Sequence, residues 1–174
     1  MQFNHYGGQA ARLAAELVNL PAPPAPAALE PLLAAHEILR RDLTPAQADE
    51  LWAWSRRLGR CFGDQDLGTR VAAVNDLLAD ASSSPRITMH DGHAPHLHYS
   101  APGADAAAHI RAVTAAGLAF VVCNAAPHRL GRCARCDRAY VDTSRNGRRT
   151  YCTVRCANND AVTRHRTTRR GAAA

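Results

Sequence analysis

The sequence Cys133-Ala-Arg-Cys136 and, after 15 intervening residues, Cys152-Thr-Val-Arg-Cys156 decides the fold of the C-terminal part of this chain. Each cysteine pair offers two sulfurs from one short turn, and the loop between the pairs allows them to converge on one ion. This spacing suits tetrahedral zinc, so we expect one structural zinc ion bound by Cys133, Cys136, Cys152 and Cys156. Two disulfides, or ordinary buried thiols, are the alternative interpretations.

The charge of the chain is concentrated around these cysteines. Residues 1–127 carry 9 Arg against 12 acidic residues, a net charge of −3, whereas residues 128–174 carry 12 Arg against 3 acidic residues, a net charge of +9. Four thiolates on one divalent ion would lower the second value to about +7. Such a field attracts a polyanion, most simply the phosphate backbone of nucleic acid. The alternative interpretation is a solvated basic surface that keeps the protein soluble.

The composition indicates a soluble protein. The 174 residues, 47% of them hydrophobic, have room for one domain of typical size and a small appendage. We find no N-terminal signal pattern, and no apolar stretch that approaches the roughly 18 residues of a membrane span. We therefore expect a cytoplasmic protein without membrane contact. That compartment is reducing, which favours metal over disulfides for the clustered cysteines. Cys61 and Cys123, in apolar helical stretches, are predicted to pack in the interior.

Residues 1–127 are predicted to form a mostly helical domain. Leucines at helical spacing indicate a first helix that stops at Pro21, followed by a stiff Pro/Ala connector over 21–26. A second helix is expected, with one side made of Leu29, Leu32, Leu33, His36 and Leu39.

Thr44-Pro45-Ala46-Gln47 is a strong start signal for a third helix. Threonine can cap the helix, proline fits its first position, and glutamine can complete a capping box. We expect this helix to turn Leu51, Trp54 and Leu58 inward and to end at Gly59 or Gly63. Two further helical patterns cover residues 67–78 and 104–125.

The pattern changes to alternation at 86–90 and 96–100, on either side of a turn, which predicts a β-hairpin. The fold class is therefore α+β. This segment also supplies a candidate ligand pocket, made of His90, His93, His96 and His98. The same imidazoles could hold the metal of an enzyme. However, no HExxH motif accompanies them and Asp91 is the only carboxylate in the segment, so we expect no enzyme activity.

We place the boundary of the C-terminal module near residue 127, so that the module covers 128–170 and a tail covers 171–174. A short strand is expected over 139–142, an Asn-Gly turn over 144–147, and a helix from about Thr153 onward. This is the pattern of a treble-clef-like or ribbon-like zinc finger ending in a helix. Along that helix, we expect one side to pack on the strands, namely Val154, Ala157 and Ala161.

Arginine and asparagine side chains gather beside the cysteines, in the turn and on one face of the last helix. Arginine supplies bidentate contacts to phosphate or guanine, and asparagine can pair with adenine. The predicted nucleic-acid contacts are Arg145, Asn146, Arg148, Arg149, Arg155, Asn158, Asn159, Arg166 and Arg169.

Three segments carry a resemblance to a known family: Val141-Asp-Thr-Ser-Arg-Asn-Gly-Arg-Arg149, Tyr151-Cys152 and Cys156-Ala-Asn-Asn159. They resemble the CGNR zinc finger, found at the C-terminus of bacterial transcription regulators. The preceding region, 1–127, is similar to the ABATE domain, most visibly in the hairpin from His90 to Tyr99. The resemblance implies DNA binding by the finger and a stress-response or ligand-sensing role for the first domain.

The chain departs from the four residues that name the family. Ala157 replaces glycine and Asn159 replaces arginine, whereas Cys156 and Asn158 are retained. Loss of this arginine removes one potential contact to a phosphate or a base.

These observations predict a DNA-binding transcription regulator in which a sensor or dimerisation domain, 1–127, is joined to a four-cysteine zinc finger. The expected partners are double-stranded DNA, a small-molecule effector and a second copy of the chain. One alternative is a zinc-stabilised module that binds RNA or an acidic protein. The other is a metal-dependent enzyme that uses the histidine-rich hairpin.

Overall fold

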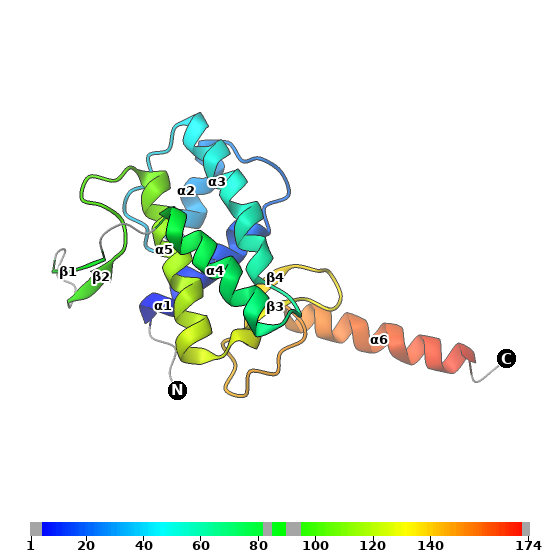
Figure 1. Ribbon diagram of the computed structural model, residues 1–174. Coiled ribbons are helices and arrows are strands. Elements are labelled where there is room, and N and C mark those ends of the chain that lie inside the picture. Colours follow the sequence, from blue (N-terminus) through cyan, green and yellow to red (C-terminus); the bar gives the residue numbers. More distant parts are fainter. Residues whose placement is uncertain (1–4, 82–84, 90–94, 172–174) are drawn as a thin grey trace.

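The computed structural model describes residues 5–81, 85–89 and 95–171, and its fold is α+β, as predicted (Figure 1). Helices dominate, and two small antiparallel strand pairs accompany them. The helical body consists of α1 (His5–Val18), α2 (Pro26–Ala35), α3 (Pro45–Leu58), α4 (Leu67–Ala81) and α5 (Ala106–Phe120), with short turns η1 (Gly59–Cys61), η2 (Val121–Ala125) and η3 (Pro127–Arg129). The strands are β1 (Arg86–Thr88), β2 (His96–His98), β3 (Leu130–Arg132) and β4 (Ala139–Val141), and α6 (Val154–Gly171) is the last helix.

Helix α5 is the centre of the helical body and packs against α1, α3 and α4. Its crossing with α1 is close, because a Cβ added at Gly117 would lie 2.6 Å from the backbone nitrogen of Ala11. A larger residue at 117 would force the two helices apart. From the other side, the indole nitrogen of Trp54 in α3 donates a hydrogen bond of 3.0 Å to the Thr114 hydroxyl. The core therefore forms around one apolar helix.

The predicted start of α3 is confirmed. The backbone nitrogen of Gln47 donates to the Thr44 hydroxyl over 3.2 Å, and the backbone nitrogen of Thr44 donates to the Gln47 side chain over 2.8 Å. This is a complete capping box with proline at the first helical position. The helix buries Leu51, Trp54 and Leu58 and ends where glycine follows, as expected.

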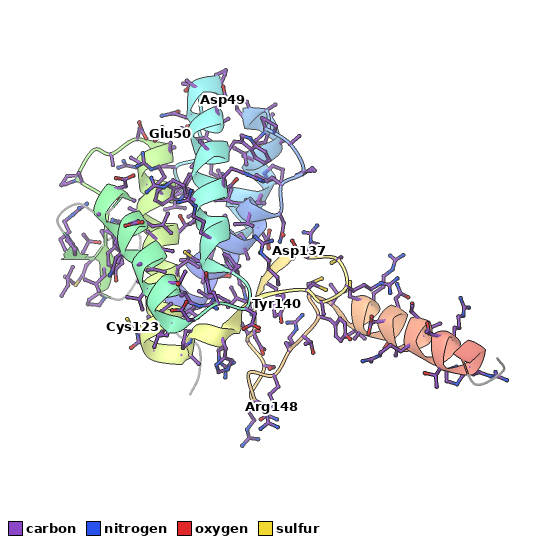
Figure 2. The ribbon with its side chains drawn as sticks, turned by 45° about the vertical axis from the view of Figure 1, so that its right-hand side comes forward. Asp49, Glu50, Cys123, Asp137, Tyr140 and Arg148 are labelled. Atoms are coloured by element: carbon purple, nitrogen blue, oxygen red, sulfur yellow. The ribbon has the colours of Figure 1, made fainter. Side chains whose placement is uncertain are left out.

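Two details of the predicted packing are wrong. Helix α2 ends at Ala35, and Glu37 then adopts a left-handed backbone with φ of 59°. The chain turns there, so Leu39 leaves the apolar side and is 65% exposed. In addition, Cys61 is buried as expected, but Cys123 in η2 is exposed at the surface (Figure 2).

The expectation that no apolar stretch is long enough for a membrane span is also corrected. Residues Ala106–Ala125 form a 20-residue helical stretch with a mean hydropathy of 1.7, so this stretch is long and apolar enough to span a membrane. However, 56% of an 18-residue part of this stretch is buried inside the protein. Its hydrophobicity is that of a core helix surrounded by α1, α3 and α4.

The predicted hairpin is present but shorter than expected. Strands β1 and β2 pair antiparallel, with Ile87 opposite Leu97. The hairpin is joined to α5 through Ser100, whose hydroxyl lies 3.1 Å from Nδ1 of His109. Of the candidate pocket, His90 and His93 lie outside the described residues, and only the backbone of His96 is described. His98 lies beside His109, with ring centroids 6.1 Å apart.

The second strand pair, β3 and β4, packs on the helical body. Leu130, Ala139 and Val141 are buried in the same core as α1 and α5. The side chain of Asn19, just after α1, forms two hydrogen bonds with the backbone of Ala139, one donated over 2.8 Å and one accepted over 2.9 Å. The amide thus binds the edge of β4 as a neighbouring strand would. The base of the C-terminal region is therefore held by the helical body.

Candidate metal centre

The first cysteine pair lies in a tight turn between β3 and β4. Cys133 follows β3 directly, and its backbone nitrogen donates to the carbonyl of Arg138 over 2.9 Å. The backbone nitrogen of Asp137 donates back to the Cys133 carbonyl over 2.9 Å, and Asp137 adopts φ of 58°. This turn brings Cys133 and Cys136 to the same end of the strand pair.

The second cysteine pair begins α6. Cys152 precedes the helix and Cys156 lies in its first turn. The backbone nitrogen of Cys156 donates to the Thr153 hydroxyl over 3.2 Å, which satisfies one of the free amides at the helix start. The backbone nitrogen of Ala134 donates to the Thr150 carbonyl over 3.0 Å and brings the two pairs together.

The four sulfurs fit tetrahedral zinc. They all lie within 4.8 Å of one another, with separations of 3.6 Å for Cys136 to Cys152 and 3.7 Å for both Cys152 to Cys156 and Cys156 to Cys136. Zinc–sulfur bonds of about 2.3 Å at tetrahedral angles place the sulfurs about 3.8 Å apart. A disulfide requires about 2.05 Å, so the disulfide interpretation does not apply. The predicted zinc site is confirmed: the four cysteines form a zinc-binding site.

The electrostatics of the quartet favour a bound cation. Burial acts to raise the pKa of Cys133, but backbone amides, first that of Cys152, donate to its sulfur and lower the pKa to about 6. Burial and the neighbouring cysteine side chains raise the pKa of Cys152 to about 12. One thiolate forms readily, and further ones are opposed by desolvation and by their neighbours. A divalent ion removes that cost by binding all four as thiolates.

A buried carboxylate organises the loop between β4 and Cys152. Asp142 is 1% exposed, and its carboxylate accepts backbone hydrogen bonds of 2.8 Å from both Ser144 and Arg149. Burial acts to raise the pKa of Asp142, but these hydrogen bonds and the Arg129 guanidinium lower it below its usual value. The same guanidinium donates to the carbonyls of Asp142 and Ser144 over 2.9 and 2.6 Å. Asp142 and Arg129 therefore fix the shape of the loop.

Sequence reasoning missed Asp142 as a site residue, although a signal was present. An aspartate two residues before a backbone amide that it can bind is typical of an Asx turn, and Asp142-Thr-Ser144 has that pattern. Two arginines of the first cysteine turn, Arg135 and Arg138, are also exposed and were not predicted as contacts. Arg135 lies between the zinc ligands Cys133 and Cys136, and Arg138 follows shortly after Cys136. This closeness to the ligands is the signal in the sequence that could have identified both arginines.

All four predicted contacts of the loop are exposed. Arg145, Asn146 and Arg148 are exposed, and Arg148 lies at the end of a loop that extends away from the helical body (Figure 2). Arg149 differs, although it too is exposed. Its guanidinium lies 5.5 Å from the Tyr140 ring centroid and donates to the carbonyls of Tyr151, over 3.2 Å, and Cys152. Arg149 therefore connects the loop to Tyr140 and Cys152 through contacts inside the finger.

Helix α6 begins as predicted, but it does not pack on the strand pair. It extends away from the rest of the protein (Figures 1 and 2). Val154 is 76% exposed and Ala161 is exposed, so their predicted packing on the strands is wrong. The physical reason is the small apolar area that one valine and two alanines can bury. The predicted contact residues of this helix are all exposed, namely Arg155, Asn158, Asn159, Arg166 and Arg169.

A family model described as the CGNR zinc finger matches residues 129–169. The match includes all four cysteines, the loop braced by Asp142, and α6 as far as Arg169. The C-terminal region is thus similar to a CGNR zinc finger, and the cysteine quartet lies inside it. No curated protein was found to match the chain. The resemblance of residues 1–127 to an ABATE domain remains a prediction, as does the boundary at 127.

Proposed function

We propose that this protein is a DNA-binding regulator of transcription whose zinc finger contacts double-stranded DNA. One observation carries the proposal: the cysteine quartet that fits zinc also holds the loop and the helix in which exposed arginines are concentrated. Residues 128–174 carry 12 Arg against 3 acidic residues. A scaffold that fixes many guanidinium groups on one region suits a partner with regularly spaced phosphates.

The distribution of acidic groups supports this proposal. Of the three acidic residues, Asp142 is buried within the loop, and Asp160 accepts a 2.7 Å hydrogen bond from the Tyr151 hydroxyl and lies 3.2 Å from Arg164. Asp137 lies 3.2 Å from Arg132. Each acid is therefore paired with a group of the finger itself. The positive charges at Arg145 and Arg148 are left to act on a polyanion.

The zinc ion has a structural role in this proposal, and we propose no catalytic activity. Four protein ligands leave no open coordination position for substrate or water. When bound, zinc supplies the link between the first cysteine turn and the start of α6. The chain's own residues then position the arginines: Asp142 holds the loop, and Arg149 joins it to Tyr140 and Cys152.

For residues 1–127 we propose an ABATE-like domain that senses a small molecule, or that dimerises, in a cytoplasmic stress response. Two observations support this proposal. The hairpin resembles that of an ABATE domain, and this region contacts the finger through the hydrogen bonds of Asn19 and the buried side chain of Leu130. A change in the helical body would reach β3 and β4 directly, since these strands share its core.

The salt dependence of duplex binding tests the proposal. Arg145→Ala and Arg148→Ala should each weaken binding to duplex DNA and reduce the slope of log affinity against log salt by about one for each phosphate that the removed guanidinium neutralised. Arg60→Ala is the matched control, because Arg60 is an exposed arginine of the helical body. An unchanged slope in both loop variants would remove the loop from the interface.

Competition at fixed salt separates DNA from the other polyanions. Duplex DNA, structured RNA and heparin are offered to the zinc-loaded protein at equal phosphate or sulfate concentration. We expect duplex DNA to compete best. Stronger competition by RNA would assign the finger to RNA, and equal competition by heparin would indicate charge attraction alone.

A further inference from the structure

The distal part of α6 stands free of the protein. Every described side chain from Ala161 to Arg169 is exposed, and the helix extends away from the body in both views (Figures 1 and 2). Its contacts with the remainder of the finger lie in its first half and reach as far as Thr163. Cys156 joins it to the quartet, Asp160 binds the Tyr151 hydroxyl, and the Arg135 guanidinium reaches the Thr163 hydroxyl over 3.4 Å. Beyond Arg164 no contact of this kind is present among the described residues.

The sequence of this free part is poor at forming a helix. Threonine, histidine and valine have low helix propensity, and they occupy 162, 163, 165, 167 and 168. The hydroxyls of Thr163, Thr167 and Thr168 donate to the carbonyls four residues earlier, over 2.9, 3.1 and 3.1 Å. Such bonds within a helix weaken it slightly.

Charge and length add to this weakness. Arg166 and Arg169 are three residues apart on one face, where like charges repel. The position of Arg169 near the C-terminal carbonyls and the pair of Asp160 with Arg164 favour the helix. Isolated helices shorter than about 12 to 15 residues are marginal in water even with good helix formers. The part of α6 after Asp160 is shorter than that, its only contact outside the helix among the described residues is that of Thr163 with Arg135, and about half of its residues have low propensity.

Because the distal part of α6 projects from the protein, it has the shape to enter the major groove of B-form DNA. A helix with its side chains is about 10–12 Å across, and the major groove of B-form DNA is about 12 Å wide and 8.5 Å deep. The exposed side chains from Asn158 to Arg169 extend over about 18 Å of helix axis. A helix that projects from its own domain can enter such a groove without collision. The major groove of A-form RNA is too narrow and deep for it.

The side chains are divided between two sides of the helix. At 100° per residue, Arg155, Asn158, Asn159, Val162, Arg166 and Arg169 lie within one sector. The opposite side carries Asp160 paired with Arg164, and Thr167 and Thr168 bonded to the helix backbone. The first side has hydrogen-bond donors for base edges and phosphates.

We infer that residues 161–171 become stably helical only inside the major groove of B-form duplex DNA, so that the finger folds the second half of its recognition helix as it binds. This inference rests on the proposed function and adds the groove and the coupled folding. In the free protein the zinc ligands hold only the first turns of α6. The groove phosphates then offset the repulsion between arginines and order the remaining turns.

Amide hydrogen exchange on the full-length, zinc-loaded protein tests this inference. The probes are a mixed-sequence DNA duplex of about 20 base pairs at low salt, an RNA duplex of the same sequence, and heparin. In the free protein, the amides of 161–171 should exchange almost as fast as those of an unfolded chain. The DNA duplex should slow them by at least about tenfold, and the RNA duplex and heparin should slow them much less.

Two outcomes overturn the inference and leave the proposed function standing. One is strong protection of 161–171 in the free protein, and the other is unchanged exchange in a complex that does form with duplex DNA. Absence of duplex binding would overturn the proposed function as well, so the two failures are distinguishable.

A pair of variants tests the coupling without changing charge. Thr167→Ala with Thr168→Ala raises helix propensity on the side opposite Arg166 and Arg169, and should tighten duplex binding about two- to fivefold because less ordering is needed. Thr167→Gly with Thr168→Gly should weaken it. If the two hydroxyls instead touched DNA, both variants would bind more weakly, so tighter binding by the alanine variant can come only from the helix. Weaker or unchanged binding by the alanine variant counts against the inference.

Discussion

The helical body buries leucines wherever its helices meet, whereas the chain beyond β4 buries almost nothing apolar. Leu17, Leu33, Leu51 and Leu118 are each 0% exposed. Among the described residues after Val141, the only buried side chain is that of Asp142. The body is therefore held together by apolar burial, and the finger by a metal ion and polar contacts. An arginine-rich segment cannot form an apolar core, so it depends on other forces.

The strand pair β3 and β4 connects the two regions. Its residues Leu130 and Val141 belong to the apolar core, and the turn between its strands carries Cys133 and Cys136. The comparison predicts that damage on one side of this strand pair leaves the other side largely intact. Each prediction below tests that separation.

Loss of a zinc ligand should have the largest effect. Cys133→Ser should abolish zinc binding, which contributes about 10–16 kcal/mol in zinc-finger peptides near neutral pH. Elemental analysis should find zinc in the parent protein and none in the variant. Amide exchange should show that 142–160 unfolds while α1, α3 and α5 stay protected. Cys123→Ser is the control, because that thiol is exposed and lies outside the quartet.

Collapse of the whole protein in Cys133→Ser would contradict the separation of the two regions. Retention of a protected loop from 142 to 149 would show that its polar contacts suffice without the ion.

A core cavity should have the next largest effect. Leu118→Ala removes a fully buried side chain from α5 and should lower the free energy of unfolding of the helical body by about 2–5 kcal/mol. Chemical denaturation followed by Trp54 fluorescence measures it. Leu39→Ala is the matched control, since Leu39 is 65% exposed, and should change stability little. Zinc content should be unaffected in both variants, and loss of zinc from Leu118→Ala would mean that the finger depends on the core.

Removal of the buried carboxylate charge should have the smallest and most local effect. Asp142→Asn leaves one oxygen for two backbone donors and should destabilise the loop by about 1–3 kcal/mol. Faster amide exchange over 144–149, with unchanged exchange in α5, is the expected result. Asp137→Asn is the control, because Asp137 is exposed and asparagine tolerates its left-handed backbone. Equal effects of the two variants would contradict the role given to Asp142.

A mutation tests the hydrogen bonds of Asp142 more selectively than a lowering of pH does. Because the pKa of Asp142 lies below its usual value, the carboxylate stabilises the folded loop above about pH 4 and loses this effect as pH falls through the lowered pKa. Protonation of the zinc thiolates also weakens metal binding as pH falls. An acid titration would therefore combine the two effects.

The sequence predicted those features that depend on local chemistry. Cysteine spacing identified the four zinc ligands, and the Thr44 to Gln47 signature placed the start of α3 correctly. Helical periodicity and alternation gave the α+β class, and the turn residues around the cysteines gave a finger that ends in a helix. In each case the decisive residues lie within a few positions of one another or share one ion.

The features that sequence reasoning missed depend on distant parts of the chain. The exposure of Val154 follows from where the quartet directs α6, which no local pattern contains. Cys123 is exposed because α1 packs on one side of α5, and at 100° per residue Cys123 lies opposite the buried Leu118 and Val121. The amide pairing between Asn19 and Ala139 joins residues 120 positions apart. Asp142 was the exception, because its Asx turn is local and recognisable.

The central claim is that one zinc ion holds the arginines in the arrangement that binds DNA. The affinity of the full-length protein for duplex DNA, measured at fixed salt before zinc removal, after chelation and after zinc is restored, tests it most directly. We predict that binding disappears on chelation and is recovered when zinc is added back, because the ion fixes where the loop and α6 lie relative to each other. Full affinity in the metal-free protein would contradict the account.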